Sequence, residues 1–284
     1  TQGYTGAVTL SGGDRTLTGT TVTTSSTLAG GTNALTVTGN ASFGGAITGV
    51  TTLSVSGTSS IGANVTTSGT QTYSGAVTLT GGVTFATTNS NISFSSTVDS
   101  DATSARGLTT SIGTGSVTFT GAVGGSRGLG AISLTGTGTT TFSGAVTAAS
   151  LIQNSTTGTT AINGGSISTT GAQTYGNAVT LGADTTLASS GSGNIAFSST
   201  INGGYSLTVN TSGATTFGGI VGATTNLTSI TTDAGGTVSI SGSITTSGAQ
   251  TYNEAATLTA AATLSASSIT TGSTFNASTF AFTL

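Results

Sequence analysis

The chain has 284 residues, a net charge of −3 and only 3% charged residues, whereas globular proteins carry about 25%. Three arginines without a single lysine cannot form the clustered positive surface that phosphate binding requires, so nucleic acid is not an expected partner. Cysteine and histidine are both absent, which excludes disulfides, thiol nucleophiles, Ser-His-Asp triads and most zinc sites.

Thr, Ser and Gly make up more than half of the chain, and proline is absent. The low net charge and the positive mean hydropathy are atypical of disordered proteins. No run approaches the roughly 18 apolar residues of a membrane-spanning helix, so no transmembrane segment is expected. No signal peptide is recognisable, and we expect a mature chain or a fragment.

Short strands are predicted along the whole chain, each marked by an aromatic residue. A β-branched residue follows four positions later in nearly every case, and a small residue usually lies midway. Segments 92–98 (ISFSSTV) and 117–123 (VTFTGAV) alternate apolar residues with Ser or Thr, which is typical of β-strands. The small midpoint residue suits a corner between strands. In chain order the aromatic residues are Tyr4, Phe43, Tyr73, Phe94, Phe119, Phe142, Tyr175, Phe197, Phe217 and Tyr252.

The aromatic residues recur at intervals near 20, for example from Phe197 to Phe217. In two wider gaps an aliphatic residue, Ile162 or Ile240, takes the place of the aromatic. An uncharged motif follows each of these substitutes after about half a unit. We interpret this motif as a phase marker that closes one group of coils and starts the next. Its copies are TTSGTQTY (66–73), TTGAQTY (169–175) and TTSGAQTY (245–252), and the chain opens with the related TQGY.

A unit of about 20 residues cannot fold alone. It offers three or four inward side chains worth ~1.5–3 kcal/mol each, against a backbone entropy cost of ~20–40 kcal/mol. Stacking the units removes this deficit, because each coil buries its strands against its neighbours. The sequence therefore predicts an all-β fold, a parallel β-helix or β-solenoid with coils of about 20 residues. We expect one shaft over residues 1–284, without a separate globular domain, whose structural core is formed by the aromatic residues above.

Parallel stacking also accounts for the composition, since a column of like charges would repel and proline would remove a ladder donor. The main rival is a tandem array of immunoglobulin-like sandwiches, because the motif tyrosines lie 69 to 102 residues apart. That alternative explains neither the spacing near 20 nor the low aromatic content.

Segment 161–222 (AINGGSISTTGAQTYGNAVTLGADTTLASSGSGNIAFSSTINGGYSLTVNTSGATTFGGIVG) resembles the repeats of very large bacterial surface proteins of the filamentous haemagglutinin type. The resemblance covers nearly the whole chain. It implies a right-handed parallel β-helix shaft that is secreted across the outer membrane and displayed outside the cell. In that family the secretion signal lies in an N-terminal domain with its own Asn-rich motifs, which have no counterpart in this sequence.

The acidic residues are scattered, and only Asp99 and Asp101 are close together. They lie with Arg106 in VDSDATSAR, within the long interval between Phe94 and Phe119. One interpretation is a Ca²⁺ or glycan contact on a protruding loop; the other is a solvated insertion that keeps charge off the stacked faces. Asp99 and Asp101 are therefore the only metal-ligand candidates. Glu254 stands at a small midpoint position and is expected to be exposed at a corner.

Two further functions of β-helices find little support in the sequence. Polysaccharide lyases and hydrolases need clustered carboxylates or bases, which six scattered acids do not supply. Outward Thr-x-Thr pairs could match an ice lattice, but we expect that these pairs do not recur coil after coil, as a flat lattice requires. The pairs are Thr16/Thr18, Thr36/Thr38 and Thr118/Thr120.

The sequence thus predicts a structural protein without catalytic activity or cofactor, the shaft of an extracellular bacterial fibre or adhesin at the cell surface. The alternative is a surface carbohydrate-binding module, and ice-binding or polysaccharide-degrading β-helices are less favoured. The chain starts inside the motif and ends on Phe280, Phe282 and Leu284, so neither end looks capped. We therefore expect it to meet further β-structure, either in a longer chain or in another copy stacked end to end. Surface glycans or other cells are further expected partners.

Overall fold

The computed structural model describes residues 1–283, and within this range the chain is all-β without any helix. Its short strands pair in parallel with strands of the preceding and following coils. The prediction of a parallel β-solenoid with coils of about 20 residues is therefore confirmed. Since the described range contains no helix, it contains none that could cross a membrane. Leu284 lies outside the described residues.

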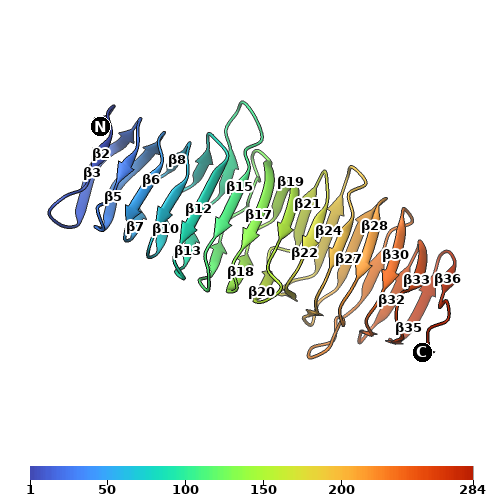
Figure 1. Cartoon of the computed structure of the whole chain (residues 1–284). Helices are drawn as coiled ribbons and strands as arrows, with labels where there is room; N and C mark the ends of the chain where they lie inside the picture. The colour runs from blue at the N-terminus through green and yellow to red at the C-terminus, as the bar shows by residue number, and fades with distance from the viewer. Residues whose placement is uncertain (284) are drawn as a thin grey trace. The chain divides into compact units, whose positions relative to one another are not determined.

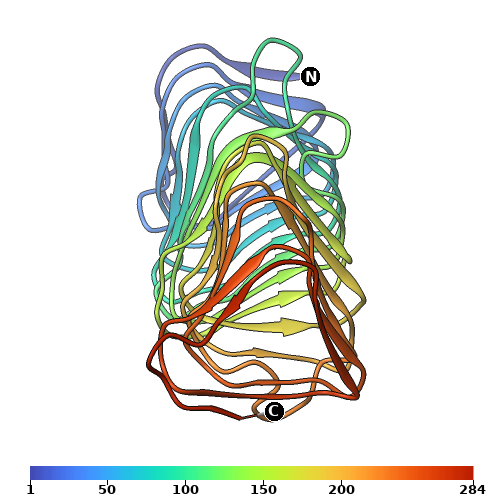
Figure 2. The same ribbon diagram turned by 90° about the vertical axis from the view of Figure 1, so that its right-hand side faces the viewer.

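The chain separates into two units, Thr1–Ala148 and Ala149–Leu284, and each is described by itself. The expectation of one shaft over residues 1–284 stays a prediction. In Figure 1, strands β5, β7, β10 and β13 of the first unit run side by side, and each belongs to a successive coil. The end view in Figure 2 shows the turns of this unit, coloured blue to green, following nearly the same outline around a common interior.

Three parallel ladders run through the described residues of the first unit. The first ladder contains the N-terminal parts of β3 (Arg15–Thr24) and β5 (Leu35–Phe43), followed by β7 (Leu53–Val55), β10 (Gln71–Tyr73), β13 (Ile92–Phe94), β16 (Val117–Phe119) and β18 (Thr139–Phe142). The second contains β1 (Gln2–Tyr4), the C-terminal parts of β3 and β5, β8 (Ser59–Ile61), β11 (Val77–Leu79) and β14 (Val98–Ser100). The third contains β2 (Val8–Thr9), β4 (Leu28–Ala29), β6 (Ile47–Val50), β9 (Val65–Thr67), β12 (Val83–Thr87), β15 (Leu108–Ser111) and β17 (Leu129–Thr135).

The second unit repeats this three-ladder plan in its described residues. Its first ladder contains the end of β19 (Val146–Gln153), then β22 (Gln173–Tyr175), β25 (Ile195–Phe197), β28 (Ala214–Phe217), β30 (Thr237–Ile240), β33 (Ala255–Leu258) and β36 (Phe275–Asn276). Its second contains β21 (Ser166–Thr169), β24 (Thr185–Ser189), β27 (Leu207–Thr211), β29 (Ile230–Thr232), β32 (Ala249–Tyr252) and β35 (Ser268–Thr271). Its third contains β20 (Thr159–Ile162), β23 (Ala178–Leu181), β26 (Ile201–Asn202), β31 (Ile244–Thr245), β34 (Ala262–Ser265) and β37 (Phe282–Thr283).

A column of stacked rings fills the interior of the first unit. Neighbouring ring centroids from Tyr73 through Phe94 and Phe119 to Phe142 are 5.0–5.2 Å apart, and the ring planes are within 8° of parallel. The ladder register imposes this stacking, because it places each ring directly over the ring of the previous coil. Phe85, which the sequence analysis did not single out, comes from the third ladder and packs edge-on against Phe94 at 5.1 Å.

The second unit has a shorter column of the same kind. Tyr175 stacks on Phe197 at 5.0 Å, and Phe197 stacks on Phe217 at 5.7 Å. Ile240 then takes the next place, since it pairs in register with Phe217. The aliphatic substitute predicted at Ile240 therefore occupies the position of an aromatic.

Nine of the aromatic residues named from the sequence are at most 1% exposed, and the exception is Tyr4, which is only half-buried. These nine are Phe43, Tyr73, Phe94, Phe119, Phe142, Tyr175, Phe197, Phe217 and Tyr252. Tyr4 pairs with Thr24 of β3, and no aromatic ring lies next to it in the register to complete a stack.

The aromatic residues do not share one column within a unit. In the second unit Tyr175 belongs to the first ladder, whereas Tyr252 pairs with Thr232 in the second. In the first unit Phe43 lies on the second ladder and Tyr73 on the first. In both units the aromatic residue before a motif copy and the tyrosine of that copy therefore lie on different ladders. This shift is what the interpretation of the motif as a phase marker predicts.

The outward hydroxyl groups are more regular than the sequence spacing suggests. The register aligns Thr16, Thr36, Ser54, Thr72, Ser93, Thr118 and Thr141 in one column. One position of the pairs therefore recurs as a mixed column of Thr and Ser, whereas the Thr-x-Thr pair itself is not repeated in every coil, because Ser54, Thr72 and Ser93 are each followed two residues later by Ser. Coil length varies from 18 residues (Thr36 to Ser54) to 25 (Ser93 to Thr118), but the loops absorb the difference, so the ladder register is kept.

Some of the small midpoint residues lie at corners where successive coils approach closely. A Cβ atom added at Gly144 would lie 2.6 Å from the carbonyl oxygen of Gly121 in the previous coil. No real side chain tolerates such a distance to a backbone atom, so glycine is required there for steric reasons.

Replacement of Phe119 by Ala should lower the free energy of unfolding by ~3–5 kcal/mol, because it leaves a cavity between two stacked rings. Thr118→Ala, one residue away on the outward face, is the matched control and should change it by less than about 0.5 kcal/mol. Chemical denaturation of both variants measures the difference, and equal stabilities would contradict the inward stacking of this column.

Candidate functional site

Three clusters of polar or charged side chains within the described residues are candidates for a functional site. The first is the loop after β14, which contains Asp101 and Arg106. The second is the buried Thr–Gln–Tyr network of the repeated motif. The third is the corner at Glu254. Within residues 1–283 no group of three or more acidic, histidine or cysteine side chains could hold a metal ion.

Asp101 organises the loop that follows β14. Arg106 donates from Nε to Asp101 Oδ1 (3.0 Å) and from Nη2 to Asp101 Oδ2 (2.9 Å), which gives a two-pronged ion pair. Thr103 Oγ1 also donates to Asp101 Oδ2 (2.9 Å). The Arg106 guanidinium, helped by Thr103, holds the pKa of the Asp101 carboxyl well below its usual range. Asp101 therefore stays ionised, and its oxygens are occupied by donors of its own loop.

Asp99 serves a different purpose. It lies on β14, and its Oδ1 accepts hydrogen bonds from the backbone N–H groups of Ser126 (2.9 Å) and Arg127 (3.2 Å) in the next coil. The structure thus gives Asp99 and Asp101 separate partners in place of a common donor set. Asp99 fastens one loop to the next, and Asp101 shapes its own loop.

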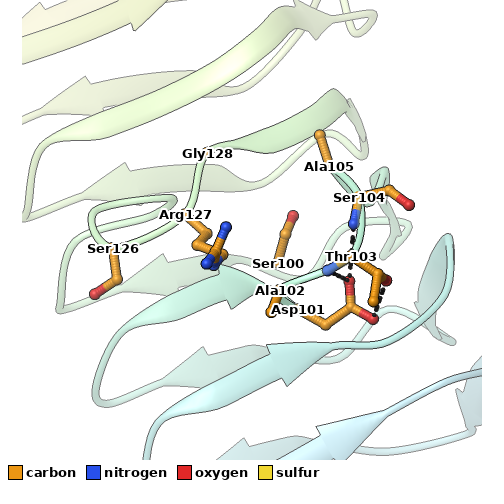
Figure 3. Close-up of a pocket in the computed structure, with 9 residues that line it drawn as sticks. All are labelled: Ser100, Asp101, Ala102, Thr103, Ser104, Ala105, Ser126, Arg127 and Gly128. Carbon is orange, nitrogen blue, oxygen red and sulfur yellow. Dashed lines mark hydrogen bonds between the residues drawn. The ribbon is translucent and has the colours of Figure 1, made fainter.

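A hollow of about 260 Å³ opens between these two loops (Figure 3). It is bordered by Ser100–Ala105 on one side and by Ser126, Arg127 and Gly128 on the other. Within the described range no carboxylate pairs with Arg127, whose side chain is exposed. The hollow therefore combines one unpaired cationic group with several hydroxyl groups, a set that can bind an anionic or hydroxylated ligand.

The repeated motif builds a buried hydrogen-bond network. Gln71 Nε2 donates to Ala86 O (2.8 Å), Val65 O (3.2 Å) and Thr67 Oγ1 (3.2 Å). Tyr73 in turn donates its hydroxyl hydrogen to Gln71 Oε1 (3.1 Å). Since Gln71 and Tyr73 are fully buried, each of these polar atoms needs a partner inside the protein.

The other two complete copies form the same bonds. Gln173 Nε2 donates to Ile167 O, Thr169 Oγ1 and Ala188 O, and Tyr175 donates to Gln173 Oε1 at 2.9 Å. Gln250 and Tyr252 repeat the arrangement, with 3.0 Å between the Tyr252 hydroxyl and Gln250 Oε1. Burial raises the pKa of all three tyrosines well above the usual range, so they remain neutral donors. In each complete copy the Thr, Gln and Tyr of the motif therefore satisfy one another's polar groups.

Glu254 is placed contrary to expectation. We expected it to be exposed at a corner, but it is only 2% exposed. Other corners usually have a small residue at this midpoint position. Here the position is occupied by Glu254, whose side chain is buried between β32 and β33. Sequence spacing alone could not reveal this, because it shows the corner position but not the side on which the side chain lies.

Replacement of Gln173 by Ala should lower the free energy of unfolding by about 2–4 kcal/mol, since it leaves Tyr175 and two backbone carbonyls without partners. Tyr175→Phe removes one bond only and should cost about 1 kcal/mol. Thr174→Ala, on the outward side of the same strand, is the control. Denaturant unfolding orders the three variants, and a Gln173→Ala effect no larger than the control would show that the network contributes nothing.

Comparison with protein-family models, with curated proteins and with solved structures gives no match to this chain.

Proposed function

We propose that this chain is a structural shaft of an extracellular bacterial fibre or adhesin, without catalytic activity. The observation that carries the proposal is the ladder register within each unit. Interior strands form backbone hydrogen bonds with both neighbouring coils, as at β10, where Gln71 N donates to Asn91 O of the next coil and Ser74 N donates to Val55 O of the previous one. Such a unit gains stability from length alone, which is the property that a spacer requires.

The mechanical argument follows from the direction of these bonds. The backbone hydrogen bonds link coil to coil, about 4.8 Å apart, so stretching the solenoid loads many bonds at once. The buried glutamine networks add side-chain bonds in the same direction, since Gln71 reaches a carbonyl of the following coil at Ala86. A stiff and protease-resistant rod is the expected consequence.

The proposed partners are further β-structure, either later coils of a longer polypeptide or another copy stacked end to end. A parallel ladder has unpaired N–H and C=O groups wherever it stops, and these groups favour continuation. The extracellular, cell-surface location is proposed from the resemblance of the repeats to those of filamentous haemagglutinin-type proteins.

Electron microscopy of producing cells, labelled with an antibody against this chain, tests the proposal. We expect label along thin fibres outside the cell, together with a native mass far above 26.8 kDa for the material released from the surface. Label confined to the cell interior, or a stable monodisperse 26.8 kDa monomer, would contradict it.

A second candidate function, carbohydrate binding, is favoured by one specific observation. The hollow beside the Asp101 loop offers the unpaired Arg127 and the hydroxyl groups of Ser104 and Ser126. A guanidinium pairs well with a sugar carboxylate, so the glycan class that fits is acidic.

An array of acidic and neutral glycans tests this candidate. We expect acidic glycans to be retained, and Arg127→Ala to weaken their binding about tenfold or more, in line with the loss of a charge-assisted hydrogen bond. Arg15→Ala removes another exposed arginine of the same unit and is the control. Equal binding by all three proteins would remove this candidate.

A further inference from the structure

Glu254 lies in a corner whose polar atoms lack partners. Both of its carboxyl oxygens are buried without a hydrogen bond, and so are Oγ1 of Thr232 and Oδ1 of Asp233. Thr232 is fully buried, and it precedes Asp233 at the end of β29, one coil before Glu254. Apart from the Thr232 hydroxyl, these atoms can only accept hydrogen bonds when both carboxyl groups are ionised. An ionised Glu254 would therefore be a buried charge without a hydrogen-bond donor, close to the partly buried carboxyl group of Asp233.

The protein supplies no positive charge that could relieve this repulsion. Residues 149–284 contain no lysine, arginine or histidine, and their acidic side chains are Asp184, Asp233 and Glu254. A buried carboxylate without a cationic partner costs several kcal/mol and is normally neutralised.

The equivalent corner of another coil shows what this position accepts. Asn177 stands two residues after the motif residue Tyr175, as Glu254 stands two residues after Tyr252. Asn177 is 1% exposed, and its Oδ1 accepts a hydrogen bond from Thr160 Oγ1 in the preceding coil at 2.9 Å. A neutral polar side chain is therefore buried at this position of another coil, with its oxygen bonded to a threonine and its Nδ2 without a partner.

Protonation of Glu254 removes its buried charge and gives it a hydroxyl hydrogen to donate. The Thr232 hydroxyl can then donate to the other Glu254 oxygen, since both groups lack partners. We propose that Glu254 keeps a proton in the folded protein and forms a pH-sensitive latch between the coil ending in β29 and the coil of β32 and β33. Loss of the proton leaves two negative charges in the corner and loosens the contact between these coils.

The surroundings of Glu254 agree with this proposal. Burial, reinforced by the negative charge of Asp233, raises the pKa of Glu254 to about 7, although the Thr232 hydroxyl opposes the rise. The other ionisable group on its own coil is Tyr252, whose hydroxyl is held by Gln250. Residues 255–283, which form the following coil, carry no ionisable side chain.

The sign of the pH effect follows from the raised pKa. In the unfolded chain Glu254 ionises near its ordinary value, about 4.3, whereas in the folded chain it keeps its proton to about pH 7. Folding therefore takes up a proton between these values. The stabilisation is complete below the lower pKa and is lost as pH rises through the higher one. Because the chain has no histidine, no other side chain of ordinary pKa titrates between pH 5 and 7.

Denaturant unfolding of the full chain between pH 5 and 8 tests the latch, with hydrogen–deuterium exchange to locate the loosened segment. The unfolding equilibrium constant should rise by up to about tenfold per pH unit between pH 5 and 7 and level off above pH 7. At pH 8, amides of residues 230–258 should exchange faster in the natural protein than in Glu254→Gln, whose amide imitates Asn177.

Glu254→Gln should remove the slope, and Asp184→Asn, which changes another acid of the same unit, should leave it intact. An equal slope in Glu254→Gln would overturn the proposal. The same measurement at pH 8 with 5 mM Ca²⁺ separates protonation of Glu254 from cation binding, since we expect no effect of the ion. A Ca²⁺-dependent gain in stability that disappears in Glu254→Gln would instead assign the corner to a metal ion.

Discussion

The structure depends on one constraint, the register of parallel backbone hydrogen bonds between consecutive coils. A parallel ladder places each residue directly over its counterpart in the next coil. Each side chain must therefore pack against the side chains directly above and below it. Phe94 meets Tyr73 and Phe119 as parallel rings for this reason, with planes within 8°. The same rule disfavours charge, since a charged residue would meet its own kind on a ladder face.

The polar residues of the repeated motif enter the interior as a group whose members satisfy one another. In this Thr–Gln–Tyr network the glutamine Nε2 donates to backbone carbonyls such as Val65 O and Ala86 O. The tyrosine hydroxyl donates to the glutamine Oε1. The same bonds form on different ladders, so the network is a property of the motif and not of one face. It allows the aromatic position to shift between ladders without leaving a buried polar group unpaired.

Charged residues are few, and the structure gives several of them local partners. Asp101 and Arg106 neutralise each other in a loop outside the stacked strands, whereas Asp99 lies on β14 and accepts backbone amides from a loop of the next coil. Glu254 is the exception, because it is buried without a cation, and this exception is the reason that a titratable element can be inferred in this solenoid.

The sequence by itself determined the fold class. Alternation in segments such as 117–123, the interval near 20 and the lack of proline favoured parallel stacking over tandem sandwiches, because a short unit with few apolar side chains can bury them only against its neighbours. It also marked the aromatic positions, since a large side chain in a small-residue repeat has few places other than the interior. Only the tertiary structure decided which ladder each position joins, because loops of unequal length shift the strands: Phe43 and Tyr73 look equivalent in sequence yet lie on different ladders. It alone decided that Phe85 enters the aromatic cluster and that Glu254 turns inward, since both depend on contacts between residues distant in sequence, to which local spacing is blind.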